Sequence, residues 1–389
     1  MILNSADILS QLVEIPSVNP MGRPLSGTEF LETRLSDFLE SLFKRLGLQT
    51  WRQTVHPDRD NIIARLDGDV DTTVLLEVHQ DTVPTDGMTI APFAATRSDG
   101  RLYGRGACDV KGGMAAMLTA LSQLAAQQPK GMPTVFMACT ANEEHGFTGA
   151  TALAEQWTNA GGDAKPFCRH PDLCIVAEPT KLQVVVAHKG VVRWKCHTAG
   201  RAGHSSRPES ADNAIYTMAK VVTALQFYAT EVVSMIGEHV LCSRPTLSVG
   251  TIAGGLSVNT MPESCTIEID RRLLPGERPD AARQHVIEFL ESENISVEHD
   301  APYLVAPGLD DEGNSHLADR LISTADRCGI NCAAIGVPYG TNAGVIAETG
   351  VSTVVFGPGD IEQAHTADEW IELEQVELAS KILFEFLRP

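Results

Sequence analysis

Acidic and imidazole side chains stand directly after short apolar runs that predict buried β-strands. His79 and Asp81 follow the run VLLEV, Glu143 and Glu144 follow TVFMACTAN, and Glu178 follows LCIVA. In open α/β sheets, ligands bind beyond the carboxyl ends of the strands. We therefore expect these side chains to converge on one face, where they could support acid–base or metal-assisted chemistry.

Two further residues extend this set. His365 follows the run VVFGPGDIEQA, and Asp109 lies in a glycine-rich turn that leads into a helical pattern. Imidazole nitrogens and carboxylate oxygens together suit a borderline cation such as Zn²⁺. Two such ions can polarise a carbonyl group and generate hydroxide together, whereas several carboxylates at one spot would be costly without cations. The pattern predicts a two-metal hydrolytic site.

Each of these residues alone has an ordinary structural explanation. A histidine after a strand is usually a hydrogen-bonded structural residue, and Glu143-Glu144 is typical of a solvated or capping pair. Glu178 could cap a turn before Pro179, and Asp109 could be a helix-entry acid. Their joint placement favours metal binding. The loop GRGACD does not complete a dinucleotide-binding fingerprint, because Asp109 replaces its third glycine, and this argues against NAD.

The segments VHQDTVP, GRGACDVKGG, ANEEHG, AEPT and QAHTADE, in this order, resemble one enzyme family. It is the family of co-catalytic zinc deacylases and exopeptidases, which includes acetylornithine deacetylase, succinyl-diaminopimelate desuccinylase, aminoacylase and glutamate carboxypeptidase. The resemblance runs from about Leu9 to Ile371 and so covers nearly the whole chain.

The resemblance implies a ligand set for two divalent ions. His79 and Glu178 would bind one ion, Glu144 and His365 would bind the other, and Asp109 would bridge the two. Zinc is the first expectation, with cobalt or manganese as alternatives.

The resemblance also implies the roles of two acids beside these ligands. Glu143 would be the base that takes a proton from the metal-bridging water and later gives it to the leaving amine. Asp81 would orient His79 through the far ring nitrogen. A cis peptide bond is further implied between Asp109 and Val110.

Residues outside the metal set would contact the substrate. His204, in the segment Gly203–Ser206, resembles a family histidine that reaches the partner's active site and stabilises the developing oxyanion. Asn259 and Arg271 resemble residues that hold the substrate carboxylate, a role for which the neighbouring Arg272 is a rival. A loop of substrate contacts would comprise Gly340, Thr341 and Asn342, although a tight turn explains these three equally well.

The order of the apolar runs predicts two domains. Runs at Val74–Val78, Thr134–Ala138, Leu173–Ala177 and Ser352–Phe356, with a helix at Gly112–Gln127, predict an α/β domain whose mostly parallel sheet is flanked by helices, as in zinc exopeptidases. We expect this catalytic domain over residues 1–187 and 302–389.

The middle third of the chain predicts a different unit, with the order β-α-β-β-α-β. Its expected elements are strands Gly190–His197, Thr246–Ile252, Ser264–Leu273 and Ile295–His299, and helices Asp212–Tyr228 and Pro279–Leu290. We expect an inserted ferredoxin-like domain over residues 188–301. The resemblance implies that it is a lid that also dimerises the protein.

Composition excludes several classes of protein. Hydrophobic residues make up 43% and charged residues 21% of 389, which is typical of a globular enzyme. A net charge of −20 would repel nucleic acid and anionic membranes, so we expect neither as a partner. The sequence predicts no signal peptide or membrane span, which indicates a cytoplasmic protein. The nine cysteines form no CxxC pair and are expected to be reduced.

Function follows from the resemblance in the form of ranked hypotheses. The first is deacylation of a small N-acylated amino acid, with N-acetylornithine as first choice, because VPYGTNAG and FGPGDIEQAHTADE resemble that deacetylase more than the desuccinylase. Such an enzyme would serve arginine biosynthesis. A dipeptidase, a carboxypeptidase or the desuccinylase on the same scaffold is the alternative. A non-catalytic binding protein would have lost ligands or the base, yet all these positions are intact.

Overall fold

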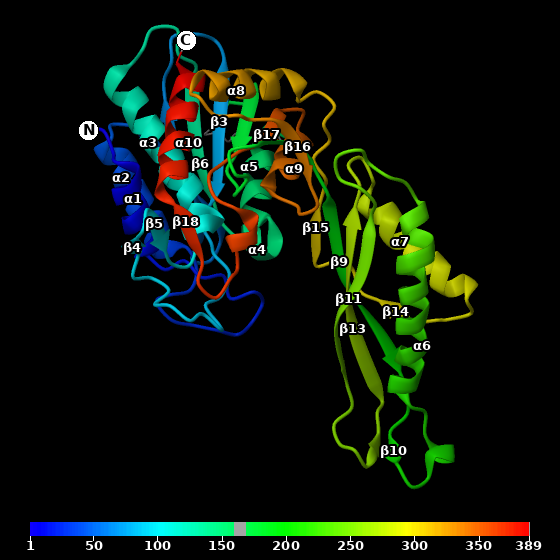
Figure 1. The fold of residues 1–389 in the computed structure, drawn as a ribbon. Coiled ribbons are helices and arrows are strands. Elements are labelled where there is room, and N and C mark those ends of the chain that lie inside the picture. The colour runs from blue at the N-terminus through cyan, green and yellow to red at the C-terminus, as the bar shows by residue number, and fades with distance from the viewer. Residues whose placement is uncertain (159–168, 389) are drawn as a thin grey trace. The chain divides into compact units, whose positions relative to one another are not determined.

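The computed structural model describes residues 1–158 and 169–388, and the chain forms two compact units (Figure 1). The first unit comprises Met1–Val186, Asp311–Ile335 and Thr341–Pro389, and the second comprises Ala187–Asp310 and Gly336–Gly340. The second unit extends beyond residue 301 because β15 (Leu304–Ala306) pairs with β9 (Gly190–Ala199). His188 and Leu309 also exchange two backbone hydrogen bonds.

The first unit is built on an eight-stranded sheet. Its strands, in spatial order, are β1 (Gln49–His56), β2 (Arg59–Leu66), β6 (Thr134–Thr140), β3 (Thr73–His79), β7 (Leu173–Val176), β17 (Ser352–Val355), β8 (Val184–His188) and β16 (Ala334–Val337). The four strands from β6 to β17 run parallel. Every residue of β3 is buried, as a near-continuous apolar run predicts for a strand covered on both faces.

Helices cover both faces of this sheet (Figure 1). On one face α1 (Ser5–Val13), α3 (Gly112–Gln127) and α10 (Leu373–Leu387) pack against one another, and on the other α5 (Thr148–Thr158) packs against α9 (Asn342–Ala347). The remaining elements of this unit are α2 (Thr33–Arg45), α4 (Glu143–Gly146), α8 (Ser315–Arg327) and a small sheet of β4 (Thr96–Ser98), β5 (Arg101–Tyr103) and β18 (Trp370–Glu372). The predicted α/β fold with a mostly parallel sheet is therefore confirmed.

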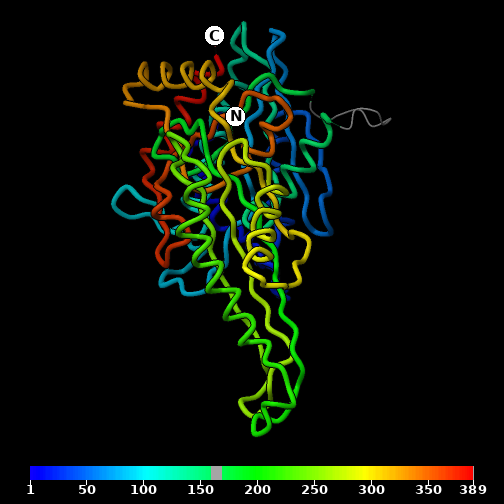
Figure 2. Tube along the Cα trace, turned by 90° about the vertical axis from the view of Figure 1, so that its right-hand side faces the viewer, coloured from blue at the N-terminus to red at the C-terminus, as the bar shows by residue number. Residues whose placement is uncertain are grey.

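The second unit has the predicted element order β-α-β-β-α-β. Its main elements are β9, α6 (Ala214–Phe227), β11 (Thr246–Gly254), β13 (Ser264–Leu273), α7 (Pro279–Ser292) and β14 (Glu298–His299). The strands lie in the order β11-β13-β9-β14, and all these pairs are antiparallel. Both helices lie on one face of the sheet (Figure 2). A short ladder joins β10 (Gly203–His204) to β12 (Thr260–Met261).

Two expectations drawn from composition concern the whole chain. Within residues 1–158 and 169–388, no helix is both long and apolar enough to cross a membrane. Eight of the nine cysteines lie in these ranges, and no disulfide joins any two of them. The ninth, Cys168, lies outside the described residues.

Candidate metal centre

Two groups of imidazole and carboxylate side chains in the first unit could each hold a metal ion. They are His79, Asp109 and Glu178, and Asp109, Glu144 and His365. Within each group the candidate ligand atoms lie within 4.8 Å of one another. The structure therefore brings together all five ligands that the resemblance implied, and Asp109 belongs to both groups.

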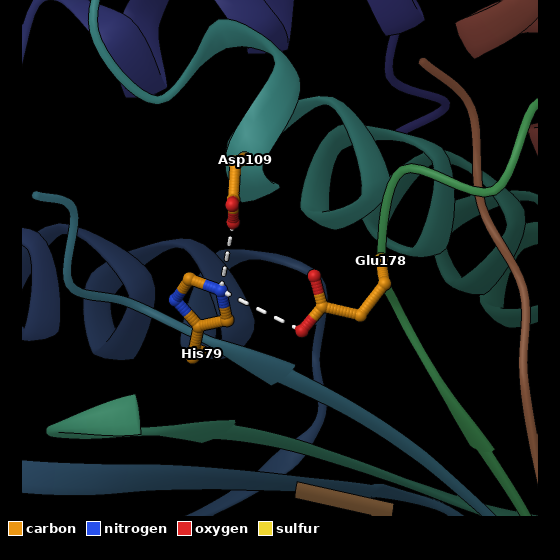
Figure 3. Close-up of side chains that lie close together, drawn as sticks. All are labelled: His79, Asp109 and Glu178. Atoms are coloured by element: carbon orange, nitrogen blue, oxygen red, sulfur yellow. Dashed lines mark hydrogen bonds and ion pairs between the residues drawn. The ribbon is translucent and has the colours of Figure 1, made fainter. Parts of the chain in front are cut away.

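His79 stands at the carboxyl end of β3 and is buried. Its Nε2 lies 3.1 Å from Oδ1 of Asp109 and 3.9 Å from Oε1 of Glu178, which follows β7 (Figure 3). Its Nδ1 lies 2.9 Å from the main-chain carbonyl oxygen of Asp81. Because a carbonyl accepts but cannot donate, Nδ1 carries a proton in this contact, and Nε2 is the ring nitrogen that faces the two carboxylates and could bind a cation.

Asp109 lies between the two histidines. Its Oδ2 is 3.3 Å from Nε2 of His365, whose Nε2 is also 3.4 Å from Oε2 of Glu144. Asp109 thus presents one carboxylate oxygen to each group. The peptide bond between Asp109 and Val110 is cis, as the resemblance implied.

A buried carboxylate that the sequence reading did not single out holds the Asp109 turn. Glu369 is fully buried and accepts hydrogen bonds from the backbone N–H groups of Gly106, Cys108 and Asp109. It also pairs with Arg105 at 2.6 Å. Glu369 stands four residues after His365 in the segment QAHTADE, so one short segment supplies a candidate ligand and fixes the backbone of another. The position of Glu369 in the motif QAHTADE is the sequence feature that could have indicated this role.

The carboxylate of Asp81 has different partners from those expected. Its nearer oxygen is 3.7 Å from Nδ1 of His79, farther than the carbonyl of the same residue. The carboxylate instead accepts the backbone N–H groups of Glu143 and Glu144, at 3.0 and 3.1 Å. Asp81 therefore orients His79 through its main chain and the Glu143-Glu144 turn through its side chain.

The electrostatics of the cluster indicate a need for positive charge. Burial, followed by the charge of Asp109, raises the pKa of Glu178 well above its ordinary value, and burial raises the pKa of Glu143 similarly. Burial also raises the pKa of Glu144 to about 7. Hydrogen bonds with Asp109 and Glu144 raise the pKa of His365 to about 11. Buried negative charges of this kind require compensation, which either protons or cations can supply.

The residues present fit a pair of divalent cations. The donors are imidazole nitrogens and carboxylate oxygens, the set that zinc and similar borderline ions prefer. Oε1 of Glu144 is buried and has no hydrogen-bond partner among the described residues. A cation ligand is a physical explanation for such an oxygen, because an unpaired buried carboxylate oxygen is otherwise costly.

The predicted substrate loop is mostly turned inward. Thr341 is buried and caps α9, where its Oγ1 accepts the backbone N–H of Ala343. Asn342 is buried, and its Nδ2 donates to Glu77 at 2.9 Å and to Thr140 at 3.2 Å. Gly340 falls in the second unit. The structure therefore gives Thr341 and Asn342 structural hydrogen bonds, as a tight turn would.

His204 and Asn259 lie near each other within the second unit. The backbone of Ser205 donates to the carbonyl of Asn259, and β10 pairs His204 with Thr260. His204 is exposed, and its Nδ1 lies 2.7 Å from Oγ of Ser206.

The two arginines near the end of β13 lie on opposite faces of the sheet. Arg271 is fully buried on the helix-covered face, where its guanidinium pairs with Glu277 at 2.5 Å and donates to the carbonyl of Arg272. Arg272 is partly exposed and pairs with Asp270 at 2.8 Å. Arg271, the arginine expected to bind the substrate carboxylate, is therefore bonded within the core of its unit. Arg272, the alternative, lies on the face of the sheet that the two helices do not cover.

Comparisons with known proteins agree with this arrangement. The model of peptidase family M20/M25/M40 matches residues 75–388. An acetylornithine deacetylase of Myxococcus xanthus is 31% identical over 356 residues, which cover 90% of each chain. The M20 family metallo-carboxypeptidase Sso-CP2 of Sulfolobus solfataricus is 21% identical with a TM-score of 0.81, covering 99% of this chain and 98% of its own. The YXEP protein of Bacillus subtilis, described as a dinuclear metal binding peptidase, is 17% identical with a TM-score of 0.68, covering 98% and 96%.

The structural similarities, at these identities, support the fold alone. The match to the family model shows more than the fold, because it spans most of the sequence and includes every candidate ligand from His79 to His365. The chain is therefore a metal-dependent amidohydrolase that belongs to peptidase family M20/M25/M40.

Proposed function

We propose that this enzyme removes the acyl group from a small N-acylated amino acid, with N-acetylornithine as the first substrate to test. The observation that carries the proposal is the position of Asp109, whose two carboxylate oxygens face two separate histidine–carboxylate groups. The relative named acetylornithine deacetylase, which matches over 90% of this chain, supports the choice of substrate.

Five residues would hold two divalent ions. His79 and Glu178 would hold one ion and Glu144 and His365 the other, with Asp109 shared between them. Zinc suits this set best, and cobalt or manganese are alternatives. When bound, such ions polarise the scissile carbonyl and lower the pKa of water.

Glu143 is the proposed base. It is buried beside the cluster without belonging to either ligand group, and burial raises the pKa of its carboxyl group well above the ordinary value. A carboxyl group of this kind can take a proton from the attacking water and return it to the leaving amine.

The second unit supplies the proposed contacts to the rest of the substrate. We propose that Arg272, rather than the buried Arg271, holds the substrate carboxylate together with Asn259, because only an accessible guanidinium can bind it bidentately. The proposal for His204 is that it stabilises the developing oxyanion at a partner's site. Its exposed ring supports this role. His204→Ala should lower turnover with both ions still bound.

A homodimer formed through the second unit is part of the same proposal. Among the described residues, β11 pairs with a strand on one side only, and an edge of this kind can extend a sheet across two copies. Exposed apolar residues on and after this strand, Ile252, Leu256 and Val258, support an interface there. Sedimentation of wild type and of Ile252→Lys tests it, since the variant should sediment as a monomer.

The experiment that tests the function is a substrate panel with metal-loaded enzyme. The panel contains N-acetylornithine, succinyl-diaminopimelate, other N-acyl amino acids and unblocked dipeptides. Turnover of N-acetylornithine above the rest is expected, whereas turnover of dipeptides alone would establish the peptidase alternative.

The assigned base is tested on the best substrate of that panel. Glu143→Gln should lower kcat by roughly 10²- to 10⁴-fold while metal content holds. Glu155→Gln, the same change at an exposed position on α5, is the matched control and should behave as wild type. Unchanged turnover in Glu143→Gln would remove Glu143 from the mechanism.

A further inference from the structure

Four consecutive backbone N–H groups precede and begin α4, and each donates to a side-chain oxygen from a distant part of the chain. The donors are Ala141, Asn142, Glu143 and Glu144, and the acceptors are Asn61 at 2.9 Å, Glu32 at 3.2 Å, and the two oxygens of Asp81 at 3.0 and 3.1 Å. We call residues 141–144 the acid turn. Its four N–H groups are therefore held by side chains rather than by a strand or helix ladder.

The acid turn needs such external support. Asn142 has φ 62°, in the left-handed region that few residues with a side chain adopt and that Asn tolerates better than most. The first N–H groups of a helix also have no partner within the helix. Side-chain acceptors satisfy these groups and hold the backbone from which the Glu143 side chain projects.

Glu32, which accepts the N–H of Asn142, is not part of the candidate metal centre. It is fully buried, precedes α2 and lies outside every motif noted in the sequence. Arg59 holds it with a two-pronged pair, at 2.5 Å to Oε1 and 2.9 Å to Oε2. The same Oε1 accepts the N–H of Asn142. Since Arg59 occupies both oxygens, Glu32 cannot rotate away from the acid turn without breaking the ion pair.

A second buried contact joins this support to Asp81. The Nδ2 of Asn19 donates to Oδ2 of Asp81 at 2.7 Å and to Oδ1 of Asn142 at 2.9 Å. Arg59 also lies 3.9 Å from Oδ2 of Asp81. Glu32 and Asp81 therefore belong to one connected buried network that contacts the acid turn.

We infer that Glu32, held by Arg59, is a positioning residue that fixes the direction of Glu143 through the backbone of Asn142. The inference rests on the proposed function, because it takes Glu143 to be the base. The Glu32 side chain bonds to Arg59 and to the N–H of Asn142, neither of which is a candidate metal ligand. Its loss should therefore reduce the rate of the chemical step. The candidate ligand Glu144, in the same turn, keeps its own hydrogen bond to Asp81, so metal binding should hold.

Kinetics provide the first test, on the best substrate of the panel. Glu32→Gln should lower kcat roughly 10- to 100-fold with KM unchanged, because a small misplacement of a catalytic group costs this much. The milder Arg59→Lys keeps the charge but loses the two-pronged pair, and should lower kcat by less. Asn314→Ala is the control: Asn314 is also buried in the first unit and accepts the backbone N–H of Thr353 at 2.9 Å, on β17. It should lose stability but keep its kcat.

A double-mutant cycle separates positioning from general stability. In a Glu143→Gln background, adding Glu32→Gln should change kcat no further, because the group that Glu32 positions is already absent. Multiplication of the two effects would overturn the inference. If Glu143→Gln alone keeps full activity, the proposed base fails instead, so the two failures are distinguishable.

Two readouts do not depend on turnover. Calorimetric titration with Zn²⁺ should give the same affinity and stoichiometry for Glu32→Gln as for wild type. Amide hydrogen exchange should be faster in peptides covering the acid turn in Glu32→Gln and in Arg59→Lys, but not in Asn314→Ala. Unchanged protection of the acid turn in both variants would refute the inference even for an enzyme whose substrate is not yet found.

Discussion

Nδ1 of His79 lies 2.9 Å from the main-chain oxygen of Asp81, and 3.7 Å from the nearer oxygen of its carboxylate. The ring of a candidate metal ligand is thus oriented by a backbone group that no substitution of the Asp81 side chain removes. The carboxylate is free for a separate task, namely holding the N–H groups of Glu143 and Glu144.

Asp81→Asn distinguishes the role of the Asp81 main chain, which orients His79, from that of its carboxylate, which holds Glu143 and Glu144. The amide can accept only through one oxygen, so one of the two N–H groups loses its acceptor, and we expect kcat to fall roughly 10- to 100-fold. Zn²⁺ affinity, measured by calorimetry, should stay near that of wild type. A loss of affinity by about 10- to 100-fold would instead show that the carboxylate supports His79. His79→Ala, which removes a ligand, is the positive control for lost metal.

Metal stoichiometry should follow from the shared position of Asp109. His365→Ala removes a ligand from one group only and should leave one tightly bound ion per chain. Asp109→Ala removes a ligand from both groups and should weaken both sites. Elemental analysis after gel filtration measures the bound ions. Equal retention of metal by the two variants would contradict a bridging role for Asp109.

The two arginines of β13 should respond differently to the same change. Arg271→Met breaks a buried ion pair with Glu277 and should cost roughly 3 kcal/mol of unfolding free energy. Arg272→Met removes a partly exposed guanidinium and should cost little stability. It should instead raise KM roughly 10- to 100-fold, as loss of a charged hydrogen bond to the substrate would. Urea unfolding and steady-state kinetics on both variants test this, and the opposite pattern would restore Arg271 as the substrate contact.

Acid sensitivity should depend in part on His188, a fully buried residue at the end of β8. Burial lowers its pKa to about 4 in the folded protein, compared with about 6.5 in the unfolded chain. Because the folded pKa is the lower one, the unfolded chain binds the proton first. The stability contributed by neutral His188 is therefore fully present above about pH 6.5 and is lost as the pH falls toward 4.

His188→Gln should flatten this dependence. Between pH 6 and pH 5 the unfolding free energy of wild type should fall by up to about 1.4 kcal/mol more than that of the variant. Urea titrations in the presence of a chelator measure the difference without a contribution from metal release. His56→Gln, at an exposed position, should follow wild type. Parallel curves for His188→Gln and wild type would refute the assignment.

The sequence predicted best those features that depend on local patterns. A continuous apolar run such as Thr134–Thr140 can only be a buried strand or part of a buried helix, and its length favours the strand. Because parallel strands deliver the residues after their carboxyl ends to the same place, the convergence of His79 and Glu178 could also be predicted.

The alternation of residues along β13 distinguishes Arg271 from Arg272 in the sequence itself. Along β13 the buried residues alternate, with Ile267, Ile269 and Leu273 in the core of the unit. A period of two places Arg271 on the core face and Arg272 on the opposite face. Which of the two arginines is buried could therefore have been predicted from the strand pattern alone.

The support of the acid turn could not have been predicted in this way. Glu32 and Asn61 lie far from Asn142 in sequence, and an isolated buried Glu has no periodicity that distinguishes it from a surface Glu. Likewise, whether Asp81 uses its carbonyl or its carboxylate toward His79 depends on the geometry of a two-residue turn. Such pairings become visible only when distant segments are placed side by side.

Strand β17 is the last of the eight strands of its sheet to be synthesised, yet it lies between β7 and β8. Until it leaves the ribosome, both of its neighbours carry unpaired backbone groups, which are prone to wrong strand pairing. The second unit, by contrast, is nearly contiguous in the chain and is complete earlier except for Gly336–Gly340. During translation the inserted unit can thus fold first, while the catalytic sheet keeps two unpaired strand edges until β17 is added.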